Sequence, residues 1–168
     1  MPCRAVDSQS VKTTESGGPR GYDAGKKTKG RKRHIVTDTD GNLLGLVTHS
    51  ADIQDRDGVP GVIAQAVESH TTLAHLFADG GYSGDGLREA MADMDGPTIE
   101  IVKRPPGVTG FVVIARRWVV ERTFAWLGRC RRLVKDWEAT IASADAWILI
   151  AAIRRSTRHV ARNVAREF

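Results

Sequence analysis

Short apolar runs separated by turn signals occupy the first part of the chain, and this pattern predicts β-strands. Residues 3–7 form a short strand candidate that ends in Asp7. The apolar runs 34–37 and 43–50 flank the sequence Asp-Thr-Asp-Gly-Asn, which is a strong hairpin signal. No helical pattern separates these runs, so we expect the fold to begin with three antiparallel strands.

From residue 51 onward, helical and strand patterns alternate. Residues 59–69 have apolar positions at helical spacing, and a short apolar strand over 73–78 leads to Asp79. The other expected elements are a helix at 86–94, a strand at 98–102, an ambiguous segment at 111–115, a helix beginning at 116, and a last helix at 145–164. Three strands followed by alternating helices and strands are typical of an α/β fold, here RNase H-like, with helices flanking a mixed sheet. We predict that fold for residues 1–168 as one domain, with a basic loop at 15–33 and C-terminal helices at 116–168.

The helix beginning at 116 carries a single carboxylate, Glu121, in a basic and apolar surrounding. A helical wheel at about 100° per residue places Glu121 opposite an apolar face. That face contains Val119, Trp126, Leu127, Cys130, Leu133, Val134 and Trp137. For the segment alone, the simplest interpretation is an ion pair of Glu121 with Arg117 at i−4 or with a neighbouring arginine.

Composition restricts the class of protein. The chain has 168 residues, 41% of them hydrophobic, which is ordinary for one globular domain. It contains no apolar run of about 18 residues and no signal-peptide pattern, so we expect a cytoplasmic protein without a membrane partner. Cys3 and Cys130 have no zinc-site spacing, and the five histidines form no HExxH motif.

Charge is distributed unevenly along the chain. Residues 1–33 hold nine Lys or Arg against three acids, and residues 103–168 hold fourteen against five. The centre, residues 34–102, holds two against twelve. This pattern indicates flanks that bind a polyanion and a centre that supplies carboxylates, for example to a metal ion.

The strongest basic run precedes the strand at 34–37 and is not a P-loop, because its glycine spacing is wrong. Its charged residues are candidate phosphate contacts: Lys26, Lys27, Lys29, Arg31, Lys32 and Arg33. The alternative is a solvated loop without specificity. His34, next to the run, is either a further phosphate contact or a partly buried strand residue.

Asp7 and Asp79 are both expected at the C-terminal ends of strands, where open α/β sheets place their sites. A helix alongside can add Glu121. Three converging carboxylates repel one another unless they hold hard divalent cations such as Mg²⁺ or Mn²⁺. Two such ions about 4 Å apart can clamp the attacking and leaving oxygens of a phosphodiester displacement.

Five segments in order resemble the DDE transposases of bacterial insertion sequences, of the insertion-sequence-four/five type. They are residues 7–13, 25–34, 51–57, 78–82 and 117–122. The resemblance implies that Asp7, Asp79 and Glu121 are the catalytic, metal-binding triad. It also implies cleavage of DNA at transposon ends with Mg²⁺, for which Mn²⁺ can substitute, using two ions. Joining of the ends to target DNA, by a homo-oligomer assembled on DNA, is implied as well.

The chain departs from the family pattern around Glu121. Arg117 matches the family arginine and is an implied DNA contact, but Ile114 stands at the tyrosine position and Gly128 at the lysine position. Arg129 or Arg132 is a hypothetical substitute for that lysine as a phosphate contact. Met1 lies six residues before Asp7, so we expect the catalytic portion alone, with an upstream reading-frame product as one source of the N-terminal DNA-binding segment.

Two other functions remain open at this point. One is an RNase H-like nuclease that cuts DNA without joining it, and the other is an inactive remnant that binds DNA or a full-length transposase. Trp118, Trp126, Trp137 and Trp147 are interpreted as core or interface residues rather than base-stacking residues. Asp52, Asp55 and Asp57 are interpreted as helix-start residues rather than metal ligands.

Overall fold

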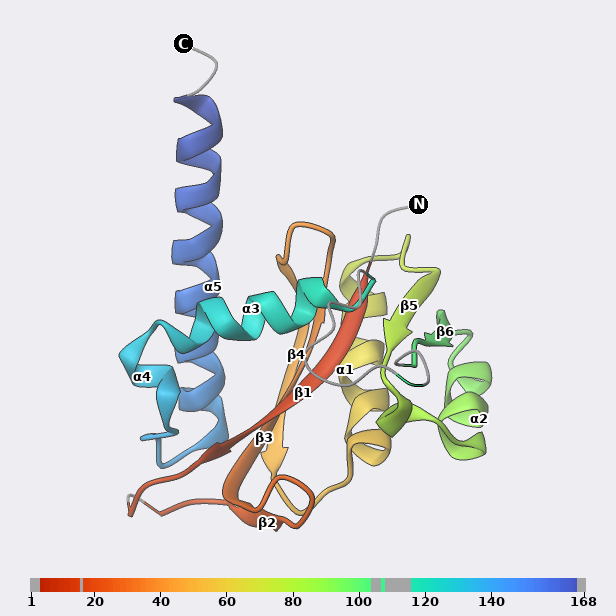
Figure 1. Cartoon of the computed structure of the whole chain (residues 1–168), viewed down its shortest axis with the longest axis horizontal. Helices are drawn as coiled ribbons and strands as arrows, with labels where there is room; N and C mark the ends of the chain where they lie inside the picture. The colour runs from red at the N-terminus through yellow and green to blue at the C-terminus, as the bar shows by residue number, and fades with distance from the viewer. Residues whose placement is uncertain (1–3, 16, 104–106, 108–115, 166–168) are drawn as a thin grey trace.

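The computed structural model describes residues 4–15, 17–103, 107 and 116–165, and the ambiguous segment at 111–115 lies outside these ranges. A mixed sheet forms the centre of the molecule, with helices on both faces (Figure 1). The strands are β1 (Ala5–Lys12), β2 (Gly21–Asp23), β3 (Thr28–Thr37), β4 (Leu43–Ser50), β5 (His75–Ala78) and β6 (Thr98–Ile101). The helices are α1 (Asp55–Ser69), the 3-10 turn η1 (Gly80–Tyr82), α2 (Asp85–Asp93), α3 (Trp118–Gly128), α4 (Arg131–Val134) and α5 (Ile141–Val164).

The sheet has the predicted RNase H-like topology. β1 lies between β3 and β5, β6 follows β5, and both β4 and the short β2 pair with β3. The β1–β3 and β3–β4 pairs are antiparallel, whereas β1–β5 and β5–β6 are parallel. The fold class predicted from the hydrophobic pattern is therefore confirmed by the strand order itself.

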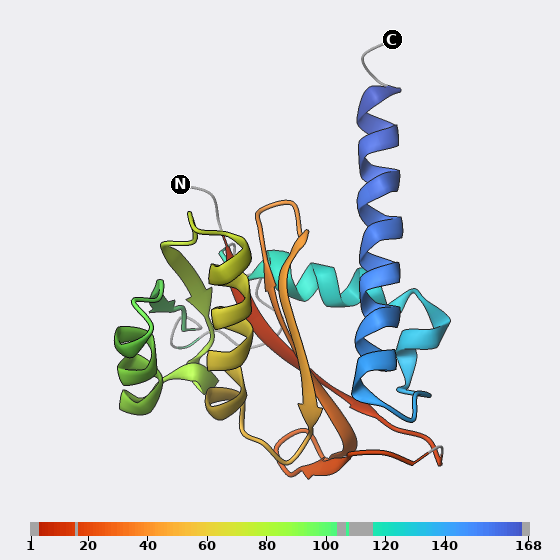
Figure 2. The same ribbon diagram turned by 180° about the vertical axis from the view of Figure 1, so that it is seen from behind.

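Alternating side chains of the strands point to opposite faces of the sheet and pack into two separate hydrophobic cores. Val6 and Val36 pack into the core beneath α1 and α2. Their neighbours Ala5 and Ile35 point to the opposite face and pack against residues of α3 and α5. Figures 1 and 2 show the same division, with α1 and α2 on one side of the sheet and α3 and α5 on the other.

The N-terminal strands are longer than the hydrophobic pattern predicts. β1 continues to Lys12 because each of its residues pairs with β3, so Asp7 is an internal strand residue rather than a strand end. β3 begins at Thr28, so the end of the predicted basic loop, residues 28–33, belongs to a strand flanked by β1 and β4, and residues 21–23 of the loop form β2. Pairing along the whole length of these strands overrides the low apolar content of the segment.

The helix carrying Glu121 is shorter than the wheel assumed. It ends at Gly128, and the extended residue Cys130 separates it from α4. The apolar face therefore holds only in part: Leu127 and Leu133 are buried, but Val134 is 62% and Trp137 46% exposed. Glycine at the end of α3 favours this break because it is a weak helix former.

The last helix starts earlier than predicted. α5 begins at Ile141 because the Thr140 hydroxyl accepts a hydrogen bond from the Ser143 backbone N–H, at 3.1 Å. Its C-terminal half extends beyond the sheet (Figure 1). Across the described residues, no helix combines the length and apolar character needed to cross a bilayer.

Candidate active site

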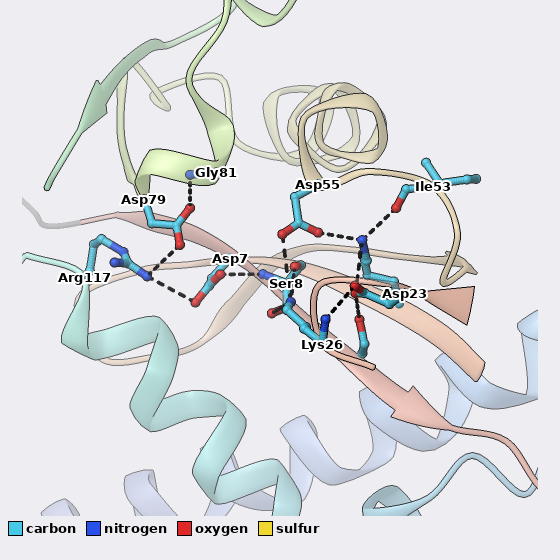
Figure 3. Close-up of polar contacts among 11 residues, drawn as sticks. Asp7, Ser8, Asp23, Lys26, Ile53, Asp55, Asp79, Gly81 and Arg117 are labelled. Carbon is cyan, nitrogen blue, oxygen red and sulfur yellow. Dashed lines mark hydrogen bonds and ion pairs between the residues drawn. The ribbon is translucent and has the colours of Figure 1, made fainter. Parts of the chain in front are cut away.

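Three carboxylates that are far apart in the sequence surround the guanidinium of Arg117. Its Nη2 atom lies 3.6 Å from Asp7 Oδ2, 3.5 Å from Asp79 Oδ2 and 3.4 Å from Glu121 Oε1. Because each oxygen lies within 3.6 Å of the same nitrogen, any two of the three oxygens are at most twice 3.6 Å apart. Figure 3 shows Asp7 of β1 and Asp79, at the start of η1, converging on Arg117 at the start of α3.

The sheet register explains why the two aspartates meet. Ala5 of β1 pairs in parallel with Phe77 of β5. Asp7 and Asp79 each follow two residues later, so parallel strands carry them to the same level of the sheet. Glu121 reaches them because Val119 and Leu127 bury the far side of α3 against the sheet core.

Backbone N–H groups fix one oxygen of each aspartate. Asp7 Oδ1 accepts from the Ser8 N–H at 2.8 Å, and Asp79 Oδ1 accepts from the Gly81 N–H at 2.8 Å. A Cβ on Gly81 would lie only 3.0 Å from Asp79 Oδ1, so a glycine suits this contact. In both residues the Oδ2 atom is left to face the shared centre.

The site has more negative charge than Arg117 can balance. Burial, together with repulsion from Asp79, raises the pKa of Asp7 to about 6, although the Ser8 hydrogen bond and Arg117 oppose that rise. One guanidinium faces three carboxylates, which leaves the group net anionic when all three are ionised. Such a group attracts additional positive charge.

The donor set suits a hard divalent cation, because all three groups offer carboxylate oxygens. As arranged here, however, the three oxygens enclose the Arg117 nitrogen. No three acidic, histidine or cysteine side chains in the described ranges stand close enough together to hold an ion. The three carboxylates thus have the ligand chemistry for Mg²⁺ or Mn²⁺, but to hold an ion Arg117 would have to leave the space between them and the carboxylates would have to draw closer together.

The basic run divides into an exposed and a buried half. Lys26, Lys27 and Lys29 are exposed, and Lys26 Nζ also donates to Ser8 O at 3.1 Å, beside the carboxylates. Arg31, Lys32 and Arg33 are at most 4% exposed. The interpretation of these three as phosphate contacts is corrected, because their side chains point into the protein.

The buried half of the run is held by internal partners. Arg31 pairs with Asp136 at 3.2 Å, with both side chains fully buried. Lys32 bridges Asp55 at 2.8 Å and Asp23 at 3.5 Å. Arg33 donates to the Leu133 carbonyl at 3.0 Å.

Asp23 and Asp55 are the residues near the site that sequence reasoning missed. Asp55 lies in the first turn of α1, as expected, and it also forms an ion pair with Lys32. Asp23 accepts from Ser10 Oγ at 2.5 Å, next to Lys32. The available signal was the density of cations at 26–33, which requires acids nearby if the segment is buried.

The remaining candidates lie away from the carboxylates. Arg132 pairs with Glu138 at 2.6 Å and stacks over Trp147, so an internal partner already engages it. Arg129, at the end of α3, is exposed. His34 is fully buried, which supports its interpretation as a strand residue and excludes phosphate contact in this structure. Ile114 lies outside the described residues.

None of the four tryptophans is fully buried, although Trp147 packs against the core beneath α3 and α5. Trp118 is 39% and Trp137 46% exposed, and Trp126 and Trp147 are half-buried. Arginine guanidinium groups stack on three of them: Arg122 on Trp118 and Trp126, Arg155 on Trp126, and Arg132 on Trp147. These cation–π contacts hold the arginine and tryptophan side chains against each other on the surface of α3 and α5.

Comparison with known proteins gives one family and two individual similarities. A family model described as a transposase DDE domain matches residues 1–154. A protein described as a transposase for insertion sequence element IS402 of Burkholderia cepacia is 32% identical over 111 residues, covering 62% of this chain and 52% of that protein. This chain thus spans about half the length of that relative. A chain of the simian T-cell lymphotropic virus intasome, solved with the PP2A regulatory subunit B56 gamma, has a TM-score of 0.46 and 13% identity, covering 87% of this chain and 51% of that one.

Proposed function

The chain belongs to the DDE transposase domain family, and from that premise we propose that it is a catalytic domain that cuts DNA at transposon ends and joins the ends to target DNA. Residues 1–168 form this one domain in the proposal. The observation that carries it is the convergence of Asp7, Asp79 and Glu121 on one atom, Arg117 Nη2, within 3.6 Å.

The proposed reaction has two phosphoryl-transfer steps. In cleavage, a water oxygen bonds to the phosphorus of a phosphodiester, and the bond to the departing 3′ oxygen breaks. In joining, that 3′ hydroxyl loses its proton and bonds to a target phosphorus, and a target 3′ oxygen leaves. Each step replaces one P–O bond with another, so no redox partner or nucleotide is required.

Asp7, Asp79 and Glu121 would hold Mg²⁺, or Mn²⁺ in its place, as two ions in the proposal. Such ions activate the attacking oxygen and neutralise charge on the leaving oxygen when bound. The protein contributes fixed ligand positions: the Ser8 and Gly81 N–H groups hold the aspartates, and α3 holds Glu121. Lys26, beside Ser8, is placed to attract phosphate to this edge of the sheet.

A strand-transfer assay tests the proposal directly. Pre-cut duplexes carrying the terminal repeats that flank the gene are incubated with the full chain, supercoiled target DNA and Mn²⁺. Asp79→Asn should lower joining by more than about 100-fold, because it removes one metal ligand. Asp85→Asn, on the exposed start of α2, is the matched control and should join like the wild type.

The assay also separates the alternatives. DNA cutting without joining would favour an RNase H-like nuclease. Neither cutting nor joining, with DNA binding retained, would favour a remnant that binds DNA or a full-length transposase.

A further inference from the structure

A cationic groove of about 530 Å³ lies between α3 and α5, away from the carboxylates. Its walls include Trp126, Trp147, Arg129, Arg154, Arg158 and Arg162, and none of the described residues that line it is acidic. Figure 1 shows the end of α3 beside the middle of α5, where α5 begins to extend beyond the sheet. The family assignment gives no role to this groove.

Four of the five arginines that line the groove face solvent, and Arg155 is the half-buried exception. Arg129, Arg154, Arg158 and Arg162 are exposed, and none pairs with a carboxylate among the residues the structure describes. Arg154, Arg158 and Arg162 follow one another at four-residue spacing, which aligns them along one side of α5. Each step along the helix is about 6 Å, so they form a row of charge rather than a single point.

The turn between β3 and β4 holds the groove in shape. Arg155 donates to Asp40 O at 3.0 Å and to Asn42 Oδ1 at 2.8 Å, and Ser156 Oγ donates to the same Asn42 oxygen at 2.9 Å. The guanidinium carbon of Arg155 lies over the Trp126 ring of α3, 4.8 Å from the ring centroid. Both walls are thus fixed by the body of the protein, within one turn of Arg158.

Helix α3 sets the distance between the groove and the carboxylates. Glu121 and Arg129 are eight residues apart, which corresponds to about 12 Å along the helix. Arg122 and the small residue Ala125 lie on the outer side of α3 between them. A duplex rises about 3.4 Å per base pair along its axis, so a duplex whose axis runs parallel to α3 would cover this distance in about four base pairs.

We propose that the α3–α5 groove binds the phosphodiester backbone of duplex DNA, beginning about four base pairs from the phosphate at the carboxylates. The inference rests on the proposed function, which places the reacting phosphate there. Binding uses charge rather than base contacts, so it positions the duplex without reading its sequence.

Fluorescence anisotropy with a 30-base-pair duplex tests the groove. The measurement uses the Asp79→Asn background, so that no DNA is cut. Adding Arg158→Ala and Arg162→Ala should weaken binding by about tenfold. The slope of the logarithm of the binding constant against the logarithm of salt concentration should become less steep by about 2. Arg158→Lys with Arg162→Lys should restore most of the affinity.

The matched control removes two exposed charges elsewhere. Arg56→Ala with Arg88→Ala takes the same net charge from α1 and α2, on the other side of the sheet. It should leave affinity within about twofold of the parent. Equal losses in both double variants, or no loss in the groove variant, would overturn the proposal.

The outcomes also separate this inference from the proposed function. If the wild type neither cuts nor joins DNA but the groove variant selectively loses affinity, the groove assignment stands and the catalytic one fails. If the wild type joins DNA but the groove variant binds as tightly as its parent, only the groove assignment fails.

Discussion

Arg117 is the residue whose role changes most between sequence and structure. In the sequence it is the i, i+4 partner of Glu121 and an implied DNA contact. In the structure its side chain is only 11% exposed and shares one nitrogen among three carboxylates. It occupies the position where a divalent cation would otherwise meet these oxygens, so arginine and metal should compete.

Arg117→Ala should therefore have opposite effects with and without metal. In EDTA the melting temperature should fall, because three carboxylates then face one another without a cation. The variant should bind Mn²⁺ about tenfold more tightly than the wild type, because no guanidinium has to be displaced. Calorimetric titration with Mn²⁺ and thermal melts in EDTA measure both effects.

Arg116→Ala is the control for this prediction. Arg116 is adjacent and exposed, and it pairs with Glu100 at 2.7 Å, outside the carboxylate group. It should leave Mn²⁺ affinity unchanged. Weaker Mn²⁺ binding in Arg117→Ala would mean that Arg117 helps to build the ion site and does not compete for it.

The burial of His34 leads to a second prediction at the residue scale, about the stability of the folded protein in acid. Burial, followed by repulsion from His49, lowers the pKa of His34 from 6.5 to about 3. The unfolded chain thus binds a proton between pH 6.5 and about 3 that the folded protein does not. The stabilising contribution of the neutral ring is complete above pH 6.5 and is lost as pH falls through this window.

Urea unfolding across pH 3–7 checks the prediction. The wild type should lose about 1.4 kcal/mol per pH unit below pH 6 relative to His34→Gln, which has no imidazole to titrate. His159→Gln, on the exposed part of α5, should follow the wild type instead. Parallel curves for His34→Gln and wild type would show that the ring is not desolvated in solution.

At the scale of elements, the β3–β4 turn joins two helices to the sheet. Besides holding Arg155 of α5, it accepts from the Thr123 hydroxyl of α3 at Gly41 O, at 3.3 Å. Gly41 has φ +82°, a conformation that favours glycine. A Cβ there would lie 2.5 Å from Thr123 Oγ1 and 3.1 Å from Trp126.

Gly41→Ala should therefore destabilise the protein by about 1–3 kcal/mol, because it adds both backbone strain and a clash with α3. Gly61→Ala is the matched control, since a Cβ at that position in α1 meets no atom within 4 Å. That control should be neutral or up to about 1 kcal/mol more stable. Chemical denaturation of the two variants compares them, and equal stabilities would contradict a close fit between turn and helix.

At the scale of the whole molecule, the formal charge of +5 understates how positive the available surface is. Acids inside the protein neutralise Arg31 and Lys32, whereas Lys27, Lys29 and the groove arginines face solvent. The exposed cations flank the carboxylate site at β3 and at α5. We therefore expect a polyanion such as DNA to be attracted along an extended surface and not only at the carboxylate site.

We expect non-specific DNA binding that depends strongly on salt. For about six phosphate contacts, the logarithm of the binding constant should fall with the logarithm of salt concentration at a slope of roughly −5. Two duplexes of unrelated sequence should bind equally. Titrations between 50 and 300 mM salt measure the slope, and constant affinity over this range would rule out binding through the basic flanks.

The sequence by itself determined the order of the longer strands and helices, the fold class and the family, but not the short elements β2, η1 and α4. Hydrophobic periodicity is local, so it predicted strand Leu43–Ser50 and the following alternation of helices and strands. The motif around Asp7, Asp79 and Glu121 was also readable, because each part is a short contiguous segment. None of these inferences requires knowledge of which distant residues touch.

Only the tertiary structure decided which charges are available and where they point. Arg31 can be buried because it pairs with Asp136. That partner lies 105 residues away in the sequence, so no local pattern predicts the pair. The position of Arg117 among three carboxylates depends on the β1–β5 register and on the packing of α3. Electrostatic roles depend on burial and distance in three dimensions, so they appear only when separate segments come together.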